Sequence, residues 1–494
     1  MRPPASEVAT TSPTTSDAPS TTALATTTTV ATTTTVAGTP EPTLAWQGCG
    51  EGLECGTLTV PLDHADPAKG TVDLFVQRRP ARDQDRRLGT LVVNPGGPGV
   101  AGTTLVEQAS FYFTDELRDR FDIVGWDPRG TGRSVPVDCV DDLDPFLIST
   151  DPTPDAPGEL EQLAAVDTVL VSGCSARSGP LLPYLSTQAS AQDMDSLRRA
   201  LGEEQLSYFG FSYGSELGAT WATTFPDTVR AAVLDGAANP NEGWEAGQTA
   251  QAAALERGFL AAMQSCAADP GCPFYSDGNP VAAYEALAAA LDAAPLPGPS
   301  ARPQAGPRLL FYATVAALRD TSRWNDLYRA LADARDGNVE RLYALYDGYV
   351  RRAPDGTFSN AIEAFVAISC LDDPGPSDPA GFPELDARIR RAAPHMGVGF
   401  GYNYACAQWP ARLGSAPPRL TAAGAGPVLV VGTTGDPITP IETARTLADD
   451  LEEGALLTVD GFRHTGYGLN RCSTDLVDRY LVDLTVPAEG TVCS

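Results

Sequence analysis

Lysine and histidine are scarce in this chain of 494 residues. Lys69 is the only lysine, and the histidines are His64, His395 and His464. The formal net charge is −29, and so acidic a surface disfavours nucleic acids and anionic membranes as partners. Apolar runs long enough to cross a bilayer are also missing, so the sequence predicts no stable membrane insertion.

The cysteine pattern lacks the spacing of a metal site. None of the 10 cysteines belongs to a Cys-x-x-Cys pair and no histidine cluster accompanies them, so we expect no metal and no organic cofactor. An even number of dispersed cysteines instead favours disulfides formed in an oxidising compartment. Spacing leaves the connectivity open, and we predict pairing in sequence order: Cys49 with Cys55, Cys139 with Cys174, Cys266 with Cys272, Cys370 with Cys406, and Cys472 with Cys493.

Residues 1–45 are rich in threonine and proline and cannot bury a core. We expect a disordered stalk that is open to glycosylation. This segment has no apolar signal-peptide region and no cysteine for a lipid anchor. Because a stalk of this kind normally follows an export signal, we expect an extracellular or cell-surface protein whose signal or anchor is not present in this sequence.

The rest of the chain divides by pattern. Short apolar segments alternate with helical patterns over residues 46–239, which is typical of a mostly parallel sheet covered on both faces. Alanine-rich helical patterns occupy residues 240–419, and strand patterns return over residues 420–494. The sequence therefore predicts an α/β fold interrupted by a helical cap domain; we expect a monomer. The expected strands include residues 72–76, 91–94, 122–126, 206–209, 231–234 and 455–459, and the expected cap helices include 250–268, 280–293 and 309–320.

Residues 210–214 read Gly-Phe-Ser-Tyr-Gly and lie between a strand pattern and a helix pattern. In this context Gly-x-Ser-x-Gly forms a tight turn that projects the serine hydroxyl beyond the end of the sheet. Ser212 is the predicted nucleophile. A serine hydroxyl needs a base to remove its proton, so a histidine must lie nearby in the fold.

The order of residues after Ser212 selects the acid and the base. Asp436 ends a strand pattern that begins at Pro427, and His464 follows the last strand pattern. This is the chain order of nucleophile, acid and histidine in the α/β-hydrolase fold. His64 lies in a turn before the nucleophile, where we expect a surface residue, and His395 lies in a loop without a preceding strand.

A glycine-rich turn follows the strand pattern of residues 91–94. An acyl-transfer site needs backbone N–H groups that stabilise the oxyanion. We predict that the amides of Gly97, in this turn, and Tyr213, next to the nucleophile, supply them.

Several motifs together resemble the secreted tripeptidyl aminopeptidases of actinobacteria, relatives of the prolyl aminopeptidases within the α/β-hydrolase fold. The resemblance runs from about residue 46 to the C-terminus and implies a serine exopeptidase that cuts short peptides from free N-termini. Ser215, Glu216 and Arg463 depart from the pattern that we expect of this family. The motifs are residues 94–99 (Asn-Pro-Gly-Gly-Pro-Gly), 125–134 (Gly-Trp-Asp-Pro-Arg-Gly-Thr-Gly-Arg-Ser), 191–198 (Ala-Gln-Asp-Met-Asp-Ser-Leu-Arg), 210–215, 233–236 and 435–440.

A peptidase that counts residues from the N-terminus must hold the substrate amine at a fixed distance from Ser212. Carboxylates of the cap suit that role, and the candidates are Asp372, Asp373 and Glu363. A solvated surface position is the alternative for each of them, because the chain has 63 acidic residues.

Charged residues also occur in the turn of residues 127–133 and in the helix pattern before the nucleophile. We expect Arg129 and Arg133 to brace the turn, with Asp127 as the partner, rather than to bind a substrate carboxylate. Asp193 and Asp195 are expected to be structural.

The sequence thus predicts an exported serine exopeptidase that acts on peptides and releases tripeptides. An ester hydrolase of the carboxylesterase or lipase type on the same fold is one alternative, since fold alone does not fix the substrate. A prolyl aminopeptidase that releases single residues is another. A non-catalytic binding protein on a decayed hydrolase scaffold is a third, and the intact set of Ser212, Asp436 and His464 argues against it.

Overall fold

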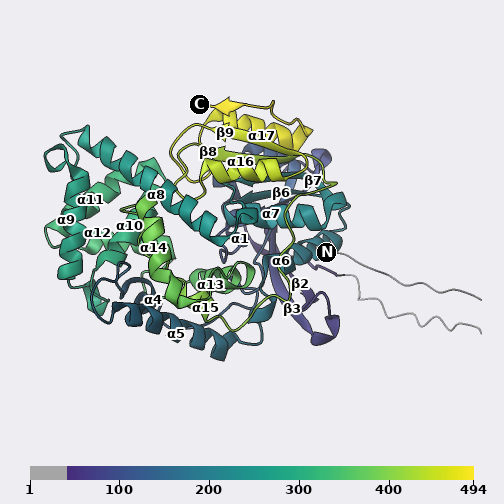
Figure 1. Ribbon diagram of the computed structural model, residues 1–494. Helices are drawn as coiled ribbons and strands as arrows, with labels where there is room; N and C mark the ends of the chain where they lie inside the picture. The colour runs from purple at the N-terminus through teal and green to yellow at the C-terminus, as the bar shows by residue number, and fades with distance from the viewer. Residues whose placement is uncertain (1–41) are drawn as a thin grey trace, which may run out of the picture. The chain divides into compact units, whose positions relative to one another are not determined.

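A computed structural model describes residues 42–494, so nearly all of the predicted stalk lies outside the described residues. The described chain forms one compact unit around a ten-stranded sheet of order β1-β2-β3-β5-β4-β6-β7-β8-β9-β10 (Figure 1). Neighbours from β1 to β5 in this order pair antiparallel and the remaining pairs are parallel. The strands are β1 Gln47–Gly50, β2 Leu53–Pro61, β3 Thr71–Arg79, β4 Gly89–Asn94, β5 Phe121–Trp126, β6 Leu206–Phe211, β7 Val229–Asp235, β8 Val428–Thr433, β9 Gly454–Val459 and β10 Val492–Cys493.

Alternation along the strands builds a core on each face of the sheet. In β4, Leu91 and Val93 pack with one cluster of buried side chains, whereas Val92 packs with the other. Because successive side chains of a strand point to opposite faces, this fully buried strand must be apolar throughout. Helices α1 (Thr103–Glu107), α3 (Asp115–Arg120) and α17 (Arg471–Asp483) cover the first face, and α6 (Thr187–Leu201), α7 (Tyr213–Thr224) and α16 (Ile441–Asp450) cover the second.

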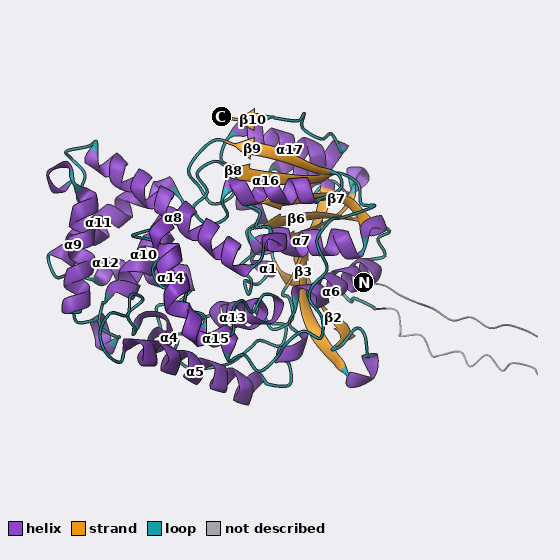
Figure 2. Ribbon diagram, in the orientation of Figure 1, coloured by secondary structure: helices purple, strands orange, loops and turns teal. Residues whose placement is uncertain are grey.

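A large helical segment separates β7 from β8 in the chain (Figure 2). The strands and helices that we predicted on both sides of this boundary are confirmed within a few residues; the helix expected over 280–293, for example, is Pro280–Ala293. The helices of this segment are α8 Trp244–Ala267, α9 Pro280–Ala293, α10 Pro307–Leu318, α11 Trp324–Arg335, α12 Glu340–Val350, α13 Ala361–Asp372, α14 Phe382–Ala392 and α15 Tyr404–Ala407.

Two helices that precede the nucleophile join this segment. Helix α4 (Asp144–Ile148) packs against α10, and α5 (Glu159–Ser178) packs against α15 (Figure 1). The helical layer thus draws on residues between β5 and β6 as well as on the predicted range 240–419. The limits of the cap as a separate domain stay a prediction, because α4 and α5 bind it to the first part of the chain.

Five disulfides link the cysteines in the order that we predicted: Cys49–Cys55, Cys139–Cys174, Cys266–Cys272, Cys370–Cys406 and Cys472–Cys493. The Cys370–Cys406 bond joins α13 to α15 and the Cys472–Cys493 bond joins α17 to β10. None of the helices between residues 42 and 494 combines the length and the apolar character that a bilayer crossing requires.

Candidate active site

Ser212 lies in the turn between β6 and α7, in a backbone conformation that L-residues rarely adopt. Its φ is 55° and its ψ is −124°. The Ser212 N–H donates to the carbonyl oxygen of Asp235 at 2.8 Å, which fixes the turn to β7. A Cβ atom at Gly210 would lie 2.2 Å from the carbonyl oxygen of Gly214, so the strand and helix approach this closely only with glycine there. This is the strained serine turn that the Gly-x-Ser-x-Gly pattern predicts.

Asp436 and His464 lie together in the loops that follow β8 and β9. Nδ1 of His464 is 2.9 Å from Oδ2 and 3.0 Å from Oδ1 of Asp436. The Asp436 carboxylate also accepts main-chain N–H bonds from Ile438, Thr439 and Thr465. Burial raises the pKa of Asp436, but the neighbouring His464 and these donors outweigh it and hold the pKa below its usual range. Asp436 therefore stays ionised and orients the imidazole.

His464 and Ser212 line the same cavity, which has a volume of about 1030 Å³. Nε2 is buried and makes no hydrogen bond within residues 42–494. Contacts between nucleophile and base are often long without substrate and tighten when the complex forms. The structure thus brings the predicted Ser212, Asp436 and His464 to one site, with Nε2 available to take a proton.

The turn after β4 lies directly against the nucleophile. A Cβ atom at Gly96 would lie 2.9 Å from Cβ of Ser212 and 3.1 Å from the amide nitrogen of Tyr213. Gly97 and Tyr213 line the cavity beside Ser212. Tyr213 opens α7, and the first N–H groups of a helix have no partner within the helix. This placement is the one expected for the two predicted oxyanion donors.

Three of the carboxyl groups that line the same cavity form a cluster: Glu216 on α7, and Asp372 and Asp373 at the end of α13. Burial, followed by the charges of Asp372 and Asp373, raises the pKa of Glu216 to about 8. Burial also raises the pKa of Asp372 to about 7, against hydrogen bonds from Thr187 that lower it. Within residues 42–494 the Glu216 carboxyl has no hydrogen bond and no ion pair. No cationic side chain among residues 42–494 therefore pairs with the Glu216 carboxyl.

Asp372 is connected to the nucleophile turn through Thr187. Its carboxylate accepts from the N–H of Thr187 at 3.0 Å and from the Thr187 hydroxyl at 2.7 Å. The same hydroxyl contacts the Tyr213 hydroxyl. Asp372 comes two residues after Cys370, whose disulfide to Cys406 fixes the end of α13. Of the two aspartates, Asp372 is held in place, whereas Asp373 is exposed to the cavity.

The structure does not bring Glu363 to this cavity. Its carboxylate accepts from the main-chain N–H groups of Cys139 at 2.7 Å and Val140 at 3.1 Å. Glu363 therefore fastens α13 to the segment before α4, and the sequence pattern gave no sign of these partners. Glu216, by contrast, is a cavity residue that we did not predict; its only sign in the sequence was its departure from the expected family pattern.

In the turn after β5, the expected pairing of Arg129 with Asp127 is wrong. Arg129 is fully buried and pairs with Asp193, at 2.6 Å, rather than with Asp127. Asp127 instead accepts from Thr103 and from the N–H of Arg133. His64 is also not a surface residue, because its Nε2 lies 2.8 Å from Asp193 and its side chain is 14% exposed. Asp193, the partner of Arg129, lies in a helix 64 residues further along the chain, which local pattern does not reveal.

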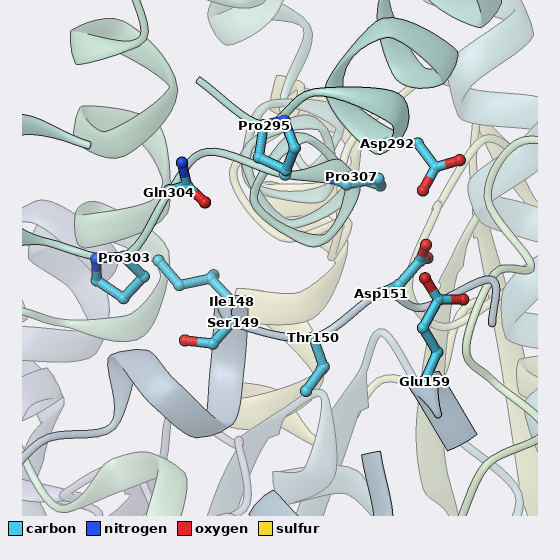
Figure 3. A pocket seen from close by; sticks show the side chains of 11 residues that line it. Ile148, Ser149, Thr150, Asp151, Glu159, Asp292, Pro295, Pro303, Gln304 and Pro307 are labelled. Atoms are coloured by element: carbon cyan, nitrogen blue, oxygen red, sulfur yellow. The ribbon is translucent and has the colours of Figure 1, made fainter. Parts of the chain in front are cut away.

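A second cavity of about 380 Å³ lies beside the start of α5 and the linkers around α9 and α10, and none of its lining residues belongs to the Ser212 site. Three of its side chains are carboxylates, Asp151, Glu159 and Asp292 (Figure 3). A hydrogen bond with Asp151, assisted by burial, raises the pKa of Asp292 to about 6. His395 is elsewhere, between Glu256 and Glu285.

The strained serine follows a central strand of a mostly parallel sheet and lies near a buried Asp–His pair and a glycine-rich turn. This arrangement is that of an α/β-hydrolase, and the protein is a serine hydrolase. Residues 393–493 match the family described as "TAP-like protein".

Relatives cover nearly the whole chain. It is 35% identical over 461 residues to "Serine protease Hip1" of Mycobacterium tuberculosis, which spans 90% of this chain and 87% of that protein. It is 36% identical over 479 residues to "Carboxylesterase B" of the same species, with 92% and 90% covered. Over 456 residues it is 30% identical to "Tripeptidyl aminopeptidase" of Streptomyces lividans, with 90% and 84% covered. The chain therefore belongs to the family of these TAP-like serine hydrolases.

Proposed function

We propose that the protein is a serine aminopeptidase that releases short peptides, mainly tripeptides, from the free N-termini of peptides. The observation that carries this proposal is the carboxyl cluster of Glu216, Asp372 and Asp373 in the cavity of Ser212. A relative named for tripeptidyl aminopeptidase activity supports the same substrate class.

Ser212 attacks the carbonyl carbon of the scissile bond while His464 takes its proton at Nε2. The amides of Gly97 and Tyr213 stabilise the oxyanion of the tetrahedral intermediate. The imidazolium, stabilised by Asp436, then gives the proton to the leaving amine, and the acyl-enzyme remains on Ser212. Water, activated by His464 in the same way, releases the acyl group as a free peptide.

The carboxyl cluster supplies the N-terminal recognition. An ammonium group of the substrate lowers the pKa of a nearby carboxyl, so Glu216 gives up its proton when the substrate binds. A stretch of three residues spans about 10 Å when extended. The number of residues released is then set by the distance between the cluster and Ser212.

We also propose that the protein works outside the cytoplasm, as an extracellular or cell-surface enzyme. The five disulfides favour this location, because such bonds persist in oxidising compartments.

A panel of fluorogenic substrates tests the peptidase proposal. It contains single-residue, dipeptidyl and tripeptidyl amides with free and with acetylated N-termini, together with simple acyl esters. We expect the highest kcat/KM for a tripeptidyl amide with a free amine. Fast cleavage of the acyl esters together with none of the amides would identify a carboxylesterase instead, the activity for which one relative is named.

A further inference from the structure

Two arginines, Arg319 and Arg351, line the cavity that His464 also lines. Arg319 follows directly after α10, and Arg351 follows directly after α12. Both side chains are exposed to the cavity. Arg319 lies over the ring of Tyr349, 5.9 Å from its centroid. Within residues 42–494, neither guanidinium has a carboxylate partner.

Two other charged groups of this region have polar contacts of their own. Arg323 forms an ion pair with Asp326 at 3.3 Å. Asp320, also a lining residue, accepts the N–H of Ser322 at 2.8 Å. Desolvation at the cavity wall lowers the pKa of Arg351, and the positive charge of Arg319 lowers it further. Two neighbouring cations without counter-ions create a positive potential that an anionic ligand would offset.

The backbone of Arg351 adds an independent observation. Its φ is 58° and its ψ is 42°, the left-handed conformation that ends α12. Glycine and asparagine adopt this conformation most readily at the end of a helix. A long cationic side chain that occupies a strained position at the wall of an active-site cavity suggests that the side chain serves the site.

The position of Arg319 associates the arginine pair with the leaving-group side of the scissile bond. The main-chain N–H of His464 donates to the carbonyl oxygen of Arg319 at 2.9 Å. The histidine delivers its proton to the leaving amine, so the leaving group must pass beside the imidazole. The carboxyl cluster of Glu216, Asp372 and Asp373 shares the cavity but belongs to other elements, α7 and α13.

We propose that Arg319 and Arg351 form an anion subsite that selects peptides with a carboxylate on the leaving side of the scissile bond. This inference rests on the proposed peptidase function. The carboxylate comes either from an Asp or Glu side chain just after the scissile bond or from the free C-terminus of a short peptide. Guanidinium groups suit both sources, since they bind carboxylates through paired N–H bonds.

The test uses four peptides that share the best tripeptidyl sequence of the substrate panel and differ only after the scissile bond. The next residue is Glu or Gln, and the C-terminus is free or amidated. Release of the N-terminal tripeptide is followed by mass spectrometry. For the wild-type enzyme we expect kcat/KM of the uncharged Gln amide to be about 10-fold below that of a charged peptide, since two partly exposed ion pairs contribute.

The comparison among the charged peptides identifies the source of the carboxylate. A higher kcat/KM for the amidated peptide with Glu after the scissile bond assigns the subsite to an acidic side chain. A higher kcat/KM for the Gln peptide with a free C-terminus assigns it to the C-terminal carboxylate. In 1 M salt the preference should shrink, because exposed charges are screened within about 3 Å.

Variants connect the preference to the two arginines. Arg319→Gln and Arg351→Asn should each bring the ratio of charged to uncharged kcat/KM closer to 1; asparagine suits the left-handed backbone at position 351. The ratio does not depend on the fraction of enzyme that is folded. Arg323→Gln is the matched control, since this cavity arginine is already paired, and it should keep the wild-type ratio.

Equal rates on all four peptides, or an unchanged ratio in both arginine variants, would overturn the subsite. In that case cleavage that still requires a free amine leaves the peptidase proposal standing. If none of the peptides is cleaved at all, the peptidase proposal fails and the subsite fails with it.

Discussion

The main-chain N–H of His464 donates a 2.9 Å hydrogen bond to the carbonyl oxygen of Arg319. The next residue, Asp320, forms an isolated antiparallel bridge with Arg463. The loop that carries the histidine is thus attached to the end of α10, in the helical segment between β7 and β8. These contacts fix the position of the histidine loop relative to that segment.

Replacement of the nucleophile should abolish turnover. Ser212→Ala removes the predicted nucleophilic hydroxyl, so we expect nearly complete loss of hydrolysis with an unchanged circular dichroism spectrum. A serine-directed fluorophosphonate should label Ser212 in the wild type. Ser369→Ala, in the same cavity, is the control and should keep most of its activity. A label on another serine would refute the assignment of the nucleophile.

The acid of the triad should matter almost as much. Asp436→Asn replaces the carboxylate that binds Nδ1 of His464 at 2.9 Å. The imidazole then loses the partner that fixes its tautomer, and a loss of about 10⁴-fold in kcat is the expected scale. Steady-state kinetics with an active-site titration measures it. Activity within a factor of ten of the wild type would show that another group orients the histidine.

The raised pKa of Glu216 predicts a pH-dependent stability difference. In the folded protein this pKa is about 8, against a usual 4.5, so between these values unfolding releases a proton. The stability contributed by the protonated group is therefore present in full below about pH 4.5 and is lost as the pH rises through 8. Glutamine carries no such proton, so the gain in Tm from Glu216→Gln should grow from pH 5 to pH 8, by roughly 3–5 °C.

Differential scanning calorimetry at the two pH values measures this gain. The exposed Glu489→Gln serves as control and should show the same small difference at both. A gain for Glu216→Gln that is equal at pH 5 and pH 8 would mean that the Glu216 carboxyl is already ionised in the folded protein at pH 5.

Loss of the disulfide next to Asp372 should affect both stability and substrate binding. The Cys370→Ala and Cys406→Ala double variant opens a loop with a sequence separation of 36. Chain entropy predicts a stability loss of about 3–4 kcal/mol for a loop of this size. Because the end of α13 is then less restrained, KM for free-amine peptides should rise more than kcat falls. Removing Cys49 and Cys55, at the edge of the sheet, should leave KM unchanged.

Local patterns were enough to predict the central strands and that Ser212, Asp436 and His464 lie at one site. Asp436 and His464 follow strands whose ends meet at one edge of a parallel sheet, so chain order alone placed them near Ser212. The buried strands could be found because residues 428–433 are apolar on both faces. The cysteines pair in sequence order as predicted, although spacing alone left the connectivity open.

Partners that come from distant elements could not be predicted in this way. Glu216 belongs to a carboxyl cluster because α13 brings Asp372 and Asp373 to the cavity that Glu216 lines from α7. The bond of Glu363 to Cys139 and the pairing of Arg129 with Asp193 depend on packing across 224 and 64 residues. The edge strand β1 was missed as well, since its residues are all exposed and give no alternation.

One cycle of four kcat/KM values tests directly whether the cavity recognises the substrate amine. Wild type and Glu216→Gln are each assayed on a tripeptidyl amide with a free and with an acetylated N-terminus. A charge-assisted contact contributes about 1.5–3 kcal/mol. The wild type should therefore prefer the free amine by about 10- to 100-fold, and Glu216→Gln should lose most of that preference. Equal rates of the wild type on free and acetylated substrates would show that the cavity does not recognise the substrate amine.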